Sequence, residues 1–121
     1  MKQLTKRENQ IMTILWNNDH AMSASDIKLS ADDLSIYTVQ QVLQKLTSMN
    51  YIRVSGIGHN KKAITRLYEP AIAQEEYILS FLKDSSALNL ATYFIESNND
   101  LEIIKELESL IQKKKKELEE K

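Results

Sequence analysis

The sequence predicts a mainly α-helical protein with one small β-hairpin, divided into two domains. Apolar residues recur with the helical period of about 3.6 residues through most of the chain. The one stretch with strand-like alternation, residues 51–68, contains both of the chain's glycines. The only proline, Pro70, follows that stretch and marks a boundary. We therefore expect a first domain over residues 1–70 and a second, helical domain over residues 71–121.

Two short helices are predicted near the N-terminus. Thr5, with a glutamate three residues later, has the capping-box pattern, in which each side chain bonds the other residue's backbone N–H. The helix that follows should end near residues 17–19. Ser23 and Asp26 repeat the pattern, so a second helix is expected at residues 24–30.

The third predicted helix, residues 35–48, has two unlike faces. Val39, Leu43 and Leu46 belong to an apolar stripe that must lie on a core. The opposite face is polar and has no acidic residue. Glutamine can bond adenine bidentately, threonine can contact a thymine methyl, and lysine can reach guanine or phosphate, although an ordinary solvated surface is the alternative. The candidate DNA-binding residues on this helix are Ser35, Tyr37, Thr38, Gln40, Gln41, Gln44 and Lys45.

A hairpin is predicted at residues 51–68, where β-branched and aromatic residues are frequent. Gly56 and Gly58 are expected at its bend, where a positive φ would be required. Lys61 and Lys62 follow them, and one arginine lies on each strand. These cations are candidates for contact with phosphates or an adjacent minor groove, and a merely solvated hairpin is the alternative.

The order helix, helix, turn, helix, hairpin is that of the winged helix-turn-helix, in which the third helix enters the DNA major groove and the hairpin, or wing, flanks it. The charge distribution agrees with binding to double-stranded DNA. Residues 1–68 carry nine Lys and Arg against five Asp and Glu, whereas residues 69–121 carry seven against twelve. The first part is therefore mildly basic although the whole chain has a net charge of -1.

Three amphipathic helical stretches are predicted in the second domain, and residues 84–86 could cap the second of them. A bundle of about 50 residues buries apolar stripes poorly, and a second copy of the chain would cover them. We therefore predict a homodimer that presents two third helices to a palindromic operator, with packing on the first domain as the alternative. The candidate dimer-interface residues are Leu88, Leu90, Ala91, Phe94, Ile95, Ile103, Ile104, Leu107, Leu110 and Ile111.

A set of short motifs along nearly the whole chain is shared with a known family. They are Leu4-Thr5, Ile11-Met12-Thr13-Ile14-Leu15-Trp16, Ser25-Asp26-Ile27, Thr38-Val39, Leu43, Lys45-Leu46, Tyr68-Glu69-Pro70 and Glu75-Glu76-Tyr77. Together they resemble the penicillinase repressor family, small bacterial DNA-binding repressors of the BlaI, MecI and CopY type. The resemblance implies a dimeric winged-helix repressor that occludes a promoter.

The chain departs from that family in several places. Antibiotic-sensing members are cut by a membrane zinc protease at an Asn-Phe bond, and the corresponding pair here is Tyr93-Phe94. The resemblance thus names a membrane sensor protease as a candidate partner and this pair as the candidate proteolytic site. The wing loop of residues 56–62 replaces a compact Gly-Arg turn, and Leu34 replaces a frequent tryptophan. Copper-responsive relatives carry a cysteine motif, but this chain has no cysteine, so a thiolate metal site is excluded and no metal or cofactor is expected.

Other function classes find less support in the residues. His20 and His59 have no partners at a catalytic or metal-binding spacing, so an enzyme is not expected. No stretch approaches the roughly 18 apolar residues of a membrane helix. The first ten residues also lack a signal peptide's apolar region, so a cytoplasmic protein without membrane insertion is expected. A winged-helix module that binds proteins rather than specific DNA sequences is the alternative function.

Overall fold

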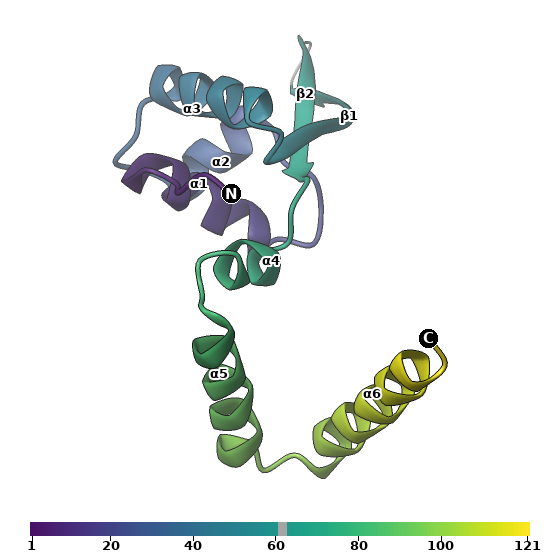
Figure 1. Cartoon of the computed structure of the whole chain (residues 1–121). Coiled ribbons are helices and arrows are strands. Elements are labelled where there is room, and N and C mark those ends of the chain that lie inside the picture. The colour runs from purple at the N-terminus through teal and green to yellow at the C-terminus, as the bar shows by residue number, and fades with distance from the viewer. Residues whose placement is uncertain (61–62) are drawn as a thin grey trace. The chain divides into compact units, whose positions relative to one another are not determined.

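The structure is a computed structural model of residues 1–121, and it describes all of them except Lys61 and Lys62 (Figure 1). The mainly helical fold class with an antiparallel hairpin is confirmed. The predicted bounds of the first three helices are also confirmed to within one residue. The elements in chain order are α1 Lys6–Trp16, α2 Ala24–Ser30, α3 Ile36–Ser48, β1 Ile52–Asn60, β2 Ala63–Pro70, α4 Gln74–Leu79, α5 Asp84–Ser97 and α6 Leu101–Glu119.

Both predicted capping boxes form. At the start of α1, Thr5 Oγ1 accepts a hydrogen bond from the N–H of Glu8 at 3.3 Å, and Glu8 Oε1 accepts one from the N–H of Thr5 at 2.9 Å. Ser23 and Asp26 make the same two bonds at the start of α2, each at 3.1 Å. These bonds satisfy backbone N–H groups that a helix cannot satisfy internally, which is why both helices begin at the predicted residues.

One apolar core lies beneath α1, α2 and α3. The largest side chains that are less than 2% exposed come from all three helices, and they are Ile11, Met12, Leu15, Ile27, Val39, Leu43 and Leu46. The predicted stripe of α3 therefore faces the core and fixes the opposite face outward. Asn50, with φ of 63°, adopts the left-handed conformation that follows α3 and directs the chain into β1. Such a residue is a common way to end a helix.

The hairpin extends further than the sequence predicted. β1 and β2 pair from Ile52 with Pro70 to Asn60 with Ala63, with a bulge between Val54 and Gly56. The expected bend at the glycines is wrong, because both lie within β1 and neither has a positive φ. Gly58 instead lies close to a side chain of β2, since a Cβ there would lie 3.1 Å from Leu67 Cδ2. The two predicted loop cations, Lys61 and Lys62, lie outside the described residues.

The short helix α4 is attached to the helices before it by an aromatic cluster centred on Tyr77. The Tyr77 hydroxyl accepts a hydrogen bond from the N–H of Leu4 at 2.8 Å. The Tyr77 ring centroid lies 5.8 Å from that of Trp16, 6.3 Å from that of Tyr51 and 4.9 Å from that of Phe81. Each such ring pair contributes about 0.5–1.5 kcal/mol beyond area burial. The pairs with Trp16 and Tyr51 therefore stabilise the packing of α4 against the preceding part of the chain.

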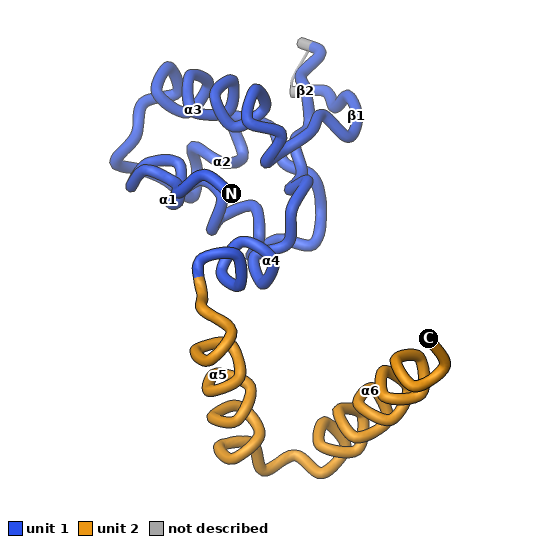
Figure 2. Tube along the Cα trace, viewed as in Figure 1, with its two compact units in different colours: residues 1–81 blue, residues 82–121 orange. Residues whose placement is uncertain are grey.

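Because α4 packs in this way, the chain divides into two compact units after it (Figure 2). Unit 1 comprises residues 1–81 and unit 2 comprises residues 82–121. The boundary predicted from the sequence lay at residue 70. In unit 2, Asp100 caps α6 by accepting the N–H of Glu102 at 3.0 Å. The expected cap of α5 does not form, since α5 already begins at Asp84 and its N-cap residue, Lys83, makes no side-chain capping bond.

Replacing Tyr77 by phenylalanine tests how the cluster holds α4. The ring contacts stay, but the N–H of Leu4 loses its acceptor. We expect the free energy of unfolding to fall by about 0.5–1.5 kcal/mol, the net contribution of one such hydrogen bond. Urea unfolding measures the change. Tyr37→Phe is the control, because that hydroxyl belongs to a side chain that is 66% exposed and its removal should cost little. Equal stabilities of the Tyr77→Phe variant and the parent protein would contradict this prediction.

Candidate nucleic-acid interface

The polar face of α3 lies on the surface of unit 1. Of its seven candidate residues only Thr38 is half-buried, and six are exposed: Ser35, Tyr37, Gln40, Gln41, Gln44 and Lys45. Val39, Leu43 and Leu46, at 0–1% exposure, anchor the helix from beneath. The side chains that could read base edges are therefore carried by a rigid element rather than by a loop.

Hydrogen bonds within α3 orient several of these side chains. Ser35 Oγ accepts the N–H of Thr38 at 3.1 Å and donates to Thr38 Oγ1 at 3.0 Å, so Ser35 is the N-cap of the helix. Gln41 Nε2 donates to the Tyr37 hydroxyl oxygen at 3.1 Å. A carboxamide has two N–H donors and one carbonyl acceptor. Gln41 thus retains one donor and its acceptor, which is the pair that bidentate bonding to adenine uses.

A groove of about 490 Å³ lies between α3 and the wing, which are side by side in Figure 1. Its described lining residues are Gln40, Gln44, Thr47, Ser48, Val54, Arg66 and Tyr68. None of these carries a carboxylate, and Arg66 supplies a positive charge. The Thr47 and Ser48 hydroxyls donate to backbone carbonyls of α3, each at 2.7 Å. The remaining side-chain donors among the described lining residues are Gln40, Gln44, Arg66 and Tyr68.

The hairpin register separates the two arginines of the wing. Arg53 lies opposite Glu69, and Arg53 Nε is 2.7 Å from Glu69 Oε1. Arg66 lies opposite Ile57 and lines the groove. Because side chains alternate between the two faces of a strand, Arg66 and Glu69 project to opposite faces. From the sequence alone the two arginines could not be distinguished, whereas in the structure only Arg66 faces α3.

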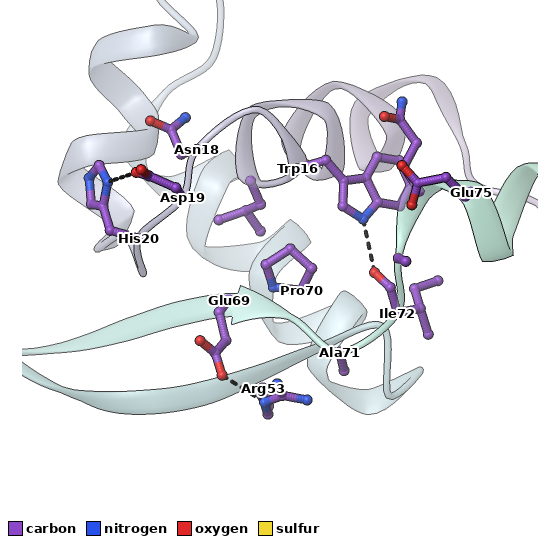
Figure 3. Close-up of a pocket in the computed structure, with 13 residues that line it drawn as sticks. Trp16, Asn18, Asp19, His20, Arg53, Glu69, Pro70, Ala71, Ile72 and Glu75 are labelled. Carbon is purple, nitrogen blue, oxygen red and sulfur yellow. Dashed lines mark hydrogen bonds and ion pairs between the residues drawn. The ribbon is translucent and has the colours of Figure 1, made fainter. Parts of the chain in front are cut away.

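A second hollow, of about 440 Å³, lies at the other face of the hairpin (Figure 3). Trp16 Nε1 donates to the carbonyl of Ile72 at 3.0 Å at its edge. His20 Nδ1 is 3.2 Å from Asp19 Oδ1, and this hydrogen bond lowers the pKa of the Asp19 carboxyl. Three carboxylates line the hollow, those of Asp19, Glu69 and Glu75. Carboxylates repel phosphate groups, so this face is a poor surface for nucleic acid.

In unit 2, none of the ten candidate dimer-interface residues is buried within the chain. Ile103, Ile104 and Leu107 are half-buried, and the other seven are exposed, with Leu88 at 67% and Leu110 at 56%. An apolar groove of about 200 Å³ lies between α5 and α6, lined by Ile95, Ile104, Leu107, Glu108, Ile111 and Gln112. Exposed apolar side chains grouped in this way are typical of a protein interface.

Tyr93 and Phe94, the candidate proteolytic site, lie within the helical turns of α5. Their side chains are 71% and 47% exposed. Across the described residues, no helix has the length and apolar character needed to cross a bilayer.

Comparison with known proteins agrees with this fold. A sequence model of the penicillinase repressor family matches residues 4–113 of the chain. No curated protein sequence matches it significantly. Among solved structures, Bacillus subtilis PadR in complex with operator DNA is similar with a TM-score of 0.52 and 19% sequence identity, over 96% of this chain and 73% of PadR.

Two further solved regulators are more distant. A MarR/EmrR family transcriptional regulator from Acinetobacter sp. ADP1 has a TM-score of 0.46 and 18% identity, over 98% of this chain and 78% of that one. The ferric uptake regulator Fur of Helicobacter pylori has a TM-score of 0.43 and 22% identity, over 57% of this chain and 46% of its own. The chain thus spans less than half the length of Fur. At such identities the PadR likeness supports the fold alone.

Proposed function

The chain belongs to the penicillinase repressor family, and from this premise we propose that it is a repressor that binds a palindromic DNA operator as a homodimer. The observation that carries the proposal is the acid-free polar face of α3, held outward by the buried stripe of Val39, Leu43 and Leu46. This helix would enter the major groove, and the wing would lie along the flanking backbone.

The candidate residues divide into two groups by what they can reach. Thr38, Gln41, Gln44 and Lys45 are proposed to contact base edges, since their side chains carry the donors and acceptors that discriminate base pairs. Ser35, Tyr37 and Gln40 are proposed to contact phosphates and so fix the register of the helix in the groove. Lys61 and Lys62, outside the described residues, are proposed as wing contacts to phosphate.

The second copy is proposed to cover the apolar surface of unit 2. No residue of α5 or α6 is buried, although these helices carry ten apolar candidate residues. Exposed apolar surface is costly by about 25 cal/mol per Å², so a two-fold partner would stabilise these helices by removing it from water. The dimer would present two copies of α3 to two half-sites, and occupancy of the operator would occlude the promoter.

Regulation by a membrane sensor protease is proposed only from the family resemblance. The Tyr93-Phe94 bond lies inside α5, so a protease that binds extended segments would first have to unwind this helix. Cleavage at the Tyr93-Phe94 bond is tested by incubating the protein with such a protease and identifying the new termini by mass spectrometry. A transcription repressor acts on chromosomal DNA, which supports a cytoplasmic location.

The proposed function is tested by selecting duplexes from a random library and titrating the enriched sequence at several salt concentrations. We expect a dimer in solution, a palindromic consensus, and a log-linear loss of affinity with salt caused by counterion release. A winged-helix module that binds proteins would enrich no sequence. Absence of any enriched duplex at low salt would overturn the proposal.

Replacing Gln41 by alanine is expected to reduce discrimination between operator variants. The loss of one bidentate base contact should lower the difference in binding free energy by about 1–3 kcal/mol at one base pair in each half-site. Anisotropy titrations against the selected operator and its single-base variants measure this. Arg53→Ala, which alters the opposite side of the hairpin, should leave discrimination unchanged. Equal weakening on every sequence would remove the base-reading role from Gln41.

A further inference from the structure

We propose that residues 1–4 form a strap that holds α4 against the rest of unit 1 and thereby determines which spacing of operator half-sites the dimer accepts. Leu4, Tyr51 and Tyr77 are the positioning residues of this strap, and none of them belongs to the surface proposed to contact DNA. The inference rests on the proposed function, in which two copies of unit 1 bind two half-sites and are joined through unit 2.

The helix α4 has little stability of its own. It comprises the six residues Gln74–Leu79, whereas isolated helices shorter than about 12–15 residues are marginal in water. Its N-cap residue, Ala73, makes no side-chain capping bond, and none of the residues of α4 is fully buried. We infer that α4 is helical because contacts with the rest of unit 1 hold it.

The strap supplies two of these contacts through its backbone. The N–H of Leu4 donates to the Tyr77 hydroxyl oxygen at 2.8 Å, and the Leu4 side chain is buried. The carbonyl of Lys2 accepts a hydrogen bond from the Tyr51 hydroxyl. Burial raises the pKa of that hydroxyl, so Tyr51 keeps its proton and remains a donor at neutral pH. Two tyrosines from separate parts of unit 1 thus bind one short backbone segment.

Tyr51 links the strap to α3. The N–H of Tyr51 donates to the carbonyl of Leu46 in α3 at 3.1 Å, and the carbonyl of Tyr51 accepts the N–H of Ala71 at 2.8 Å. The Tyr51 ring centroid lies 6.3 Å from that of Tyr77, and the side chain is 6% exposed. The strap, the last turn of α3 and α4 therefore meet at one buried residue, and α4 has a fixed position relative to α3 while the strap is in place.

Attachment of α4 shortens the connection between unit 1 and the helices of unit 2. With α4 in place, this connection comprises at most residues 80–83. The carbonyl of Ile72 is bound separately by Trp16 Nε1 at 3.0 Å, so release of α4 would extend the connection to residues 73–83. Effective concentration falls roughly as the −3/2 power of linker length, so the second half-site would be bound about fivefold more weakly. The longer connection would also reach half-sites at other spacings.

Hydrogen exchange tests the strap without DNA. Deleting residues 2–4 joins Met1 to Thr5, which keeps the capping box of α1 but removes both strap hydrogen bonds and the Leu4 side chain. The backbone amides of residues 77–81 should then exchange at least about tenfold faster than in the parent protein, as measured by mass spectrometry. The matched control, Lys2→Ala with Gln3→Ala, changes two exposed side chains but keeps the Lys2 carbonyl and the Leu4 N–H, so its exchange should equal that of the parent.

Operator duplexes with altered spacing test the consequence for DNA binding. One or two base pairs are inserted or removed between the half-sites of the selected operator. The ratio of affinities for the selected and the altered spacings should be about fivefold smaller for the deletion variant than for the parent protein. The control variant should keep the parent ratio. Circular dichroism confirms that each variant is folded, and Tyr77→Phe, which also removes the acceptor of the Leu4 N–H, replaces the deletion if that variant is not.

The two measurements separate the strap from the proposed function. Unchanged exchange in the deletion variant would overturn the strap. Faster exchange with an unchanged affinity ratio would overturn its role in half-site spacing, while DNA binding by the parent protein stands. Failure of the parent protein to bind any duplex at low salt would overturn the proposed function, and the exchange rates would still decide whether residues 1–4 hold α4.

Discussion

Replacing Leu107 by aspartate is expected to leave the protein monomeric and to weaken operator binding by about 10²- to 10⁴-fold. Leu107 lies on α6 and lines the apolar groove of unit 2 together with Ile104 and Ile111. In the proposed dimer this position would be covered by the partner, and an ionised carboxylate buried there without a cation is strongly unfavourable. Dissociation removes the second α3, which otherwise binds its half-site at the high effective concentration that the dimer provides.

Analytical ultracentrifugation and operator titrations check this prediction together. Ser109→Asp is the matched control. Ser109 is exposed and lies two residues further along the same helix, so this substitution introduces the same charge on another side of α6. The control should stay dimeric and bind as the parent protein does. Since Leu107 belongs to unit 2, thermal unfolding of unit 1 should be unaffected. A Leu107→Asp variant that stays dimeric would show that the partner covers another part of these helices.

Local signals explain why the helices of unit 1 could be predicted from the sequence. The capping boxes at Thr5 and Ser23 act within three residues, so pattern and structure agree at the starts of α1 and α2. The stripe of α3 likewise repeats within one helix, and its burial follows from the helical period of about 3.6 residues. The polar face could be identified by the same reasoning, because the residues of α3 outside the apolar stripe lie on the opposite side of the helix.

The wing and α4 depend on contacts that no local pattern reveals. The bulge after Val54 shifts the register of the hairpin, and in this register Arg66 rather than Arg53 faces α3. The bond from Leu4 to Tyr77 joins residues 73 positions apart. Tyr77 attaches α4 to unit 1 through this contact, so α4 belongs to that unit, and Pro70 is the last residue of β2.

Replacing Leu43 by alanine is expected to lower the free energy of unfolding of unit 1 by about 2–5 kcal/mol, because it leaves a cavity beneath α3. Leu43 is 1% exposed and lies among the apolar side chains that anchor this helix. A small domain has about 5–15 kcal/mol of stability, so the variant is expected to populate unfolded forms at moderate denaturant concentration. Trp16, the chain's single tryptophan, lies in unit 1 and reports its urea unfolding by fluorescence.

Leu29→Ala makes the same chemical change at a side chain that is 78% exposed. This control should shift stability by no more than about 0.5 kcal/mol, as surface substitutions usually do. The comparison separates burial from side-chain identity. If α3 is positioned by its buried stripe, the apparent affinity of Leu43→Ala for the operator should fall in proportion to the fraction of unit 1 that is folded. Added operator should in turn raise that folded fraction, because it binds only the folded form. Equal stability losses in the two variants would mean that the stripe does not anchor α3, and the outward orientation of its polar face would then need another cause.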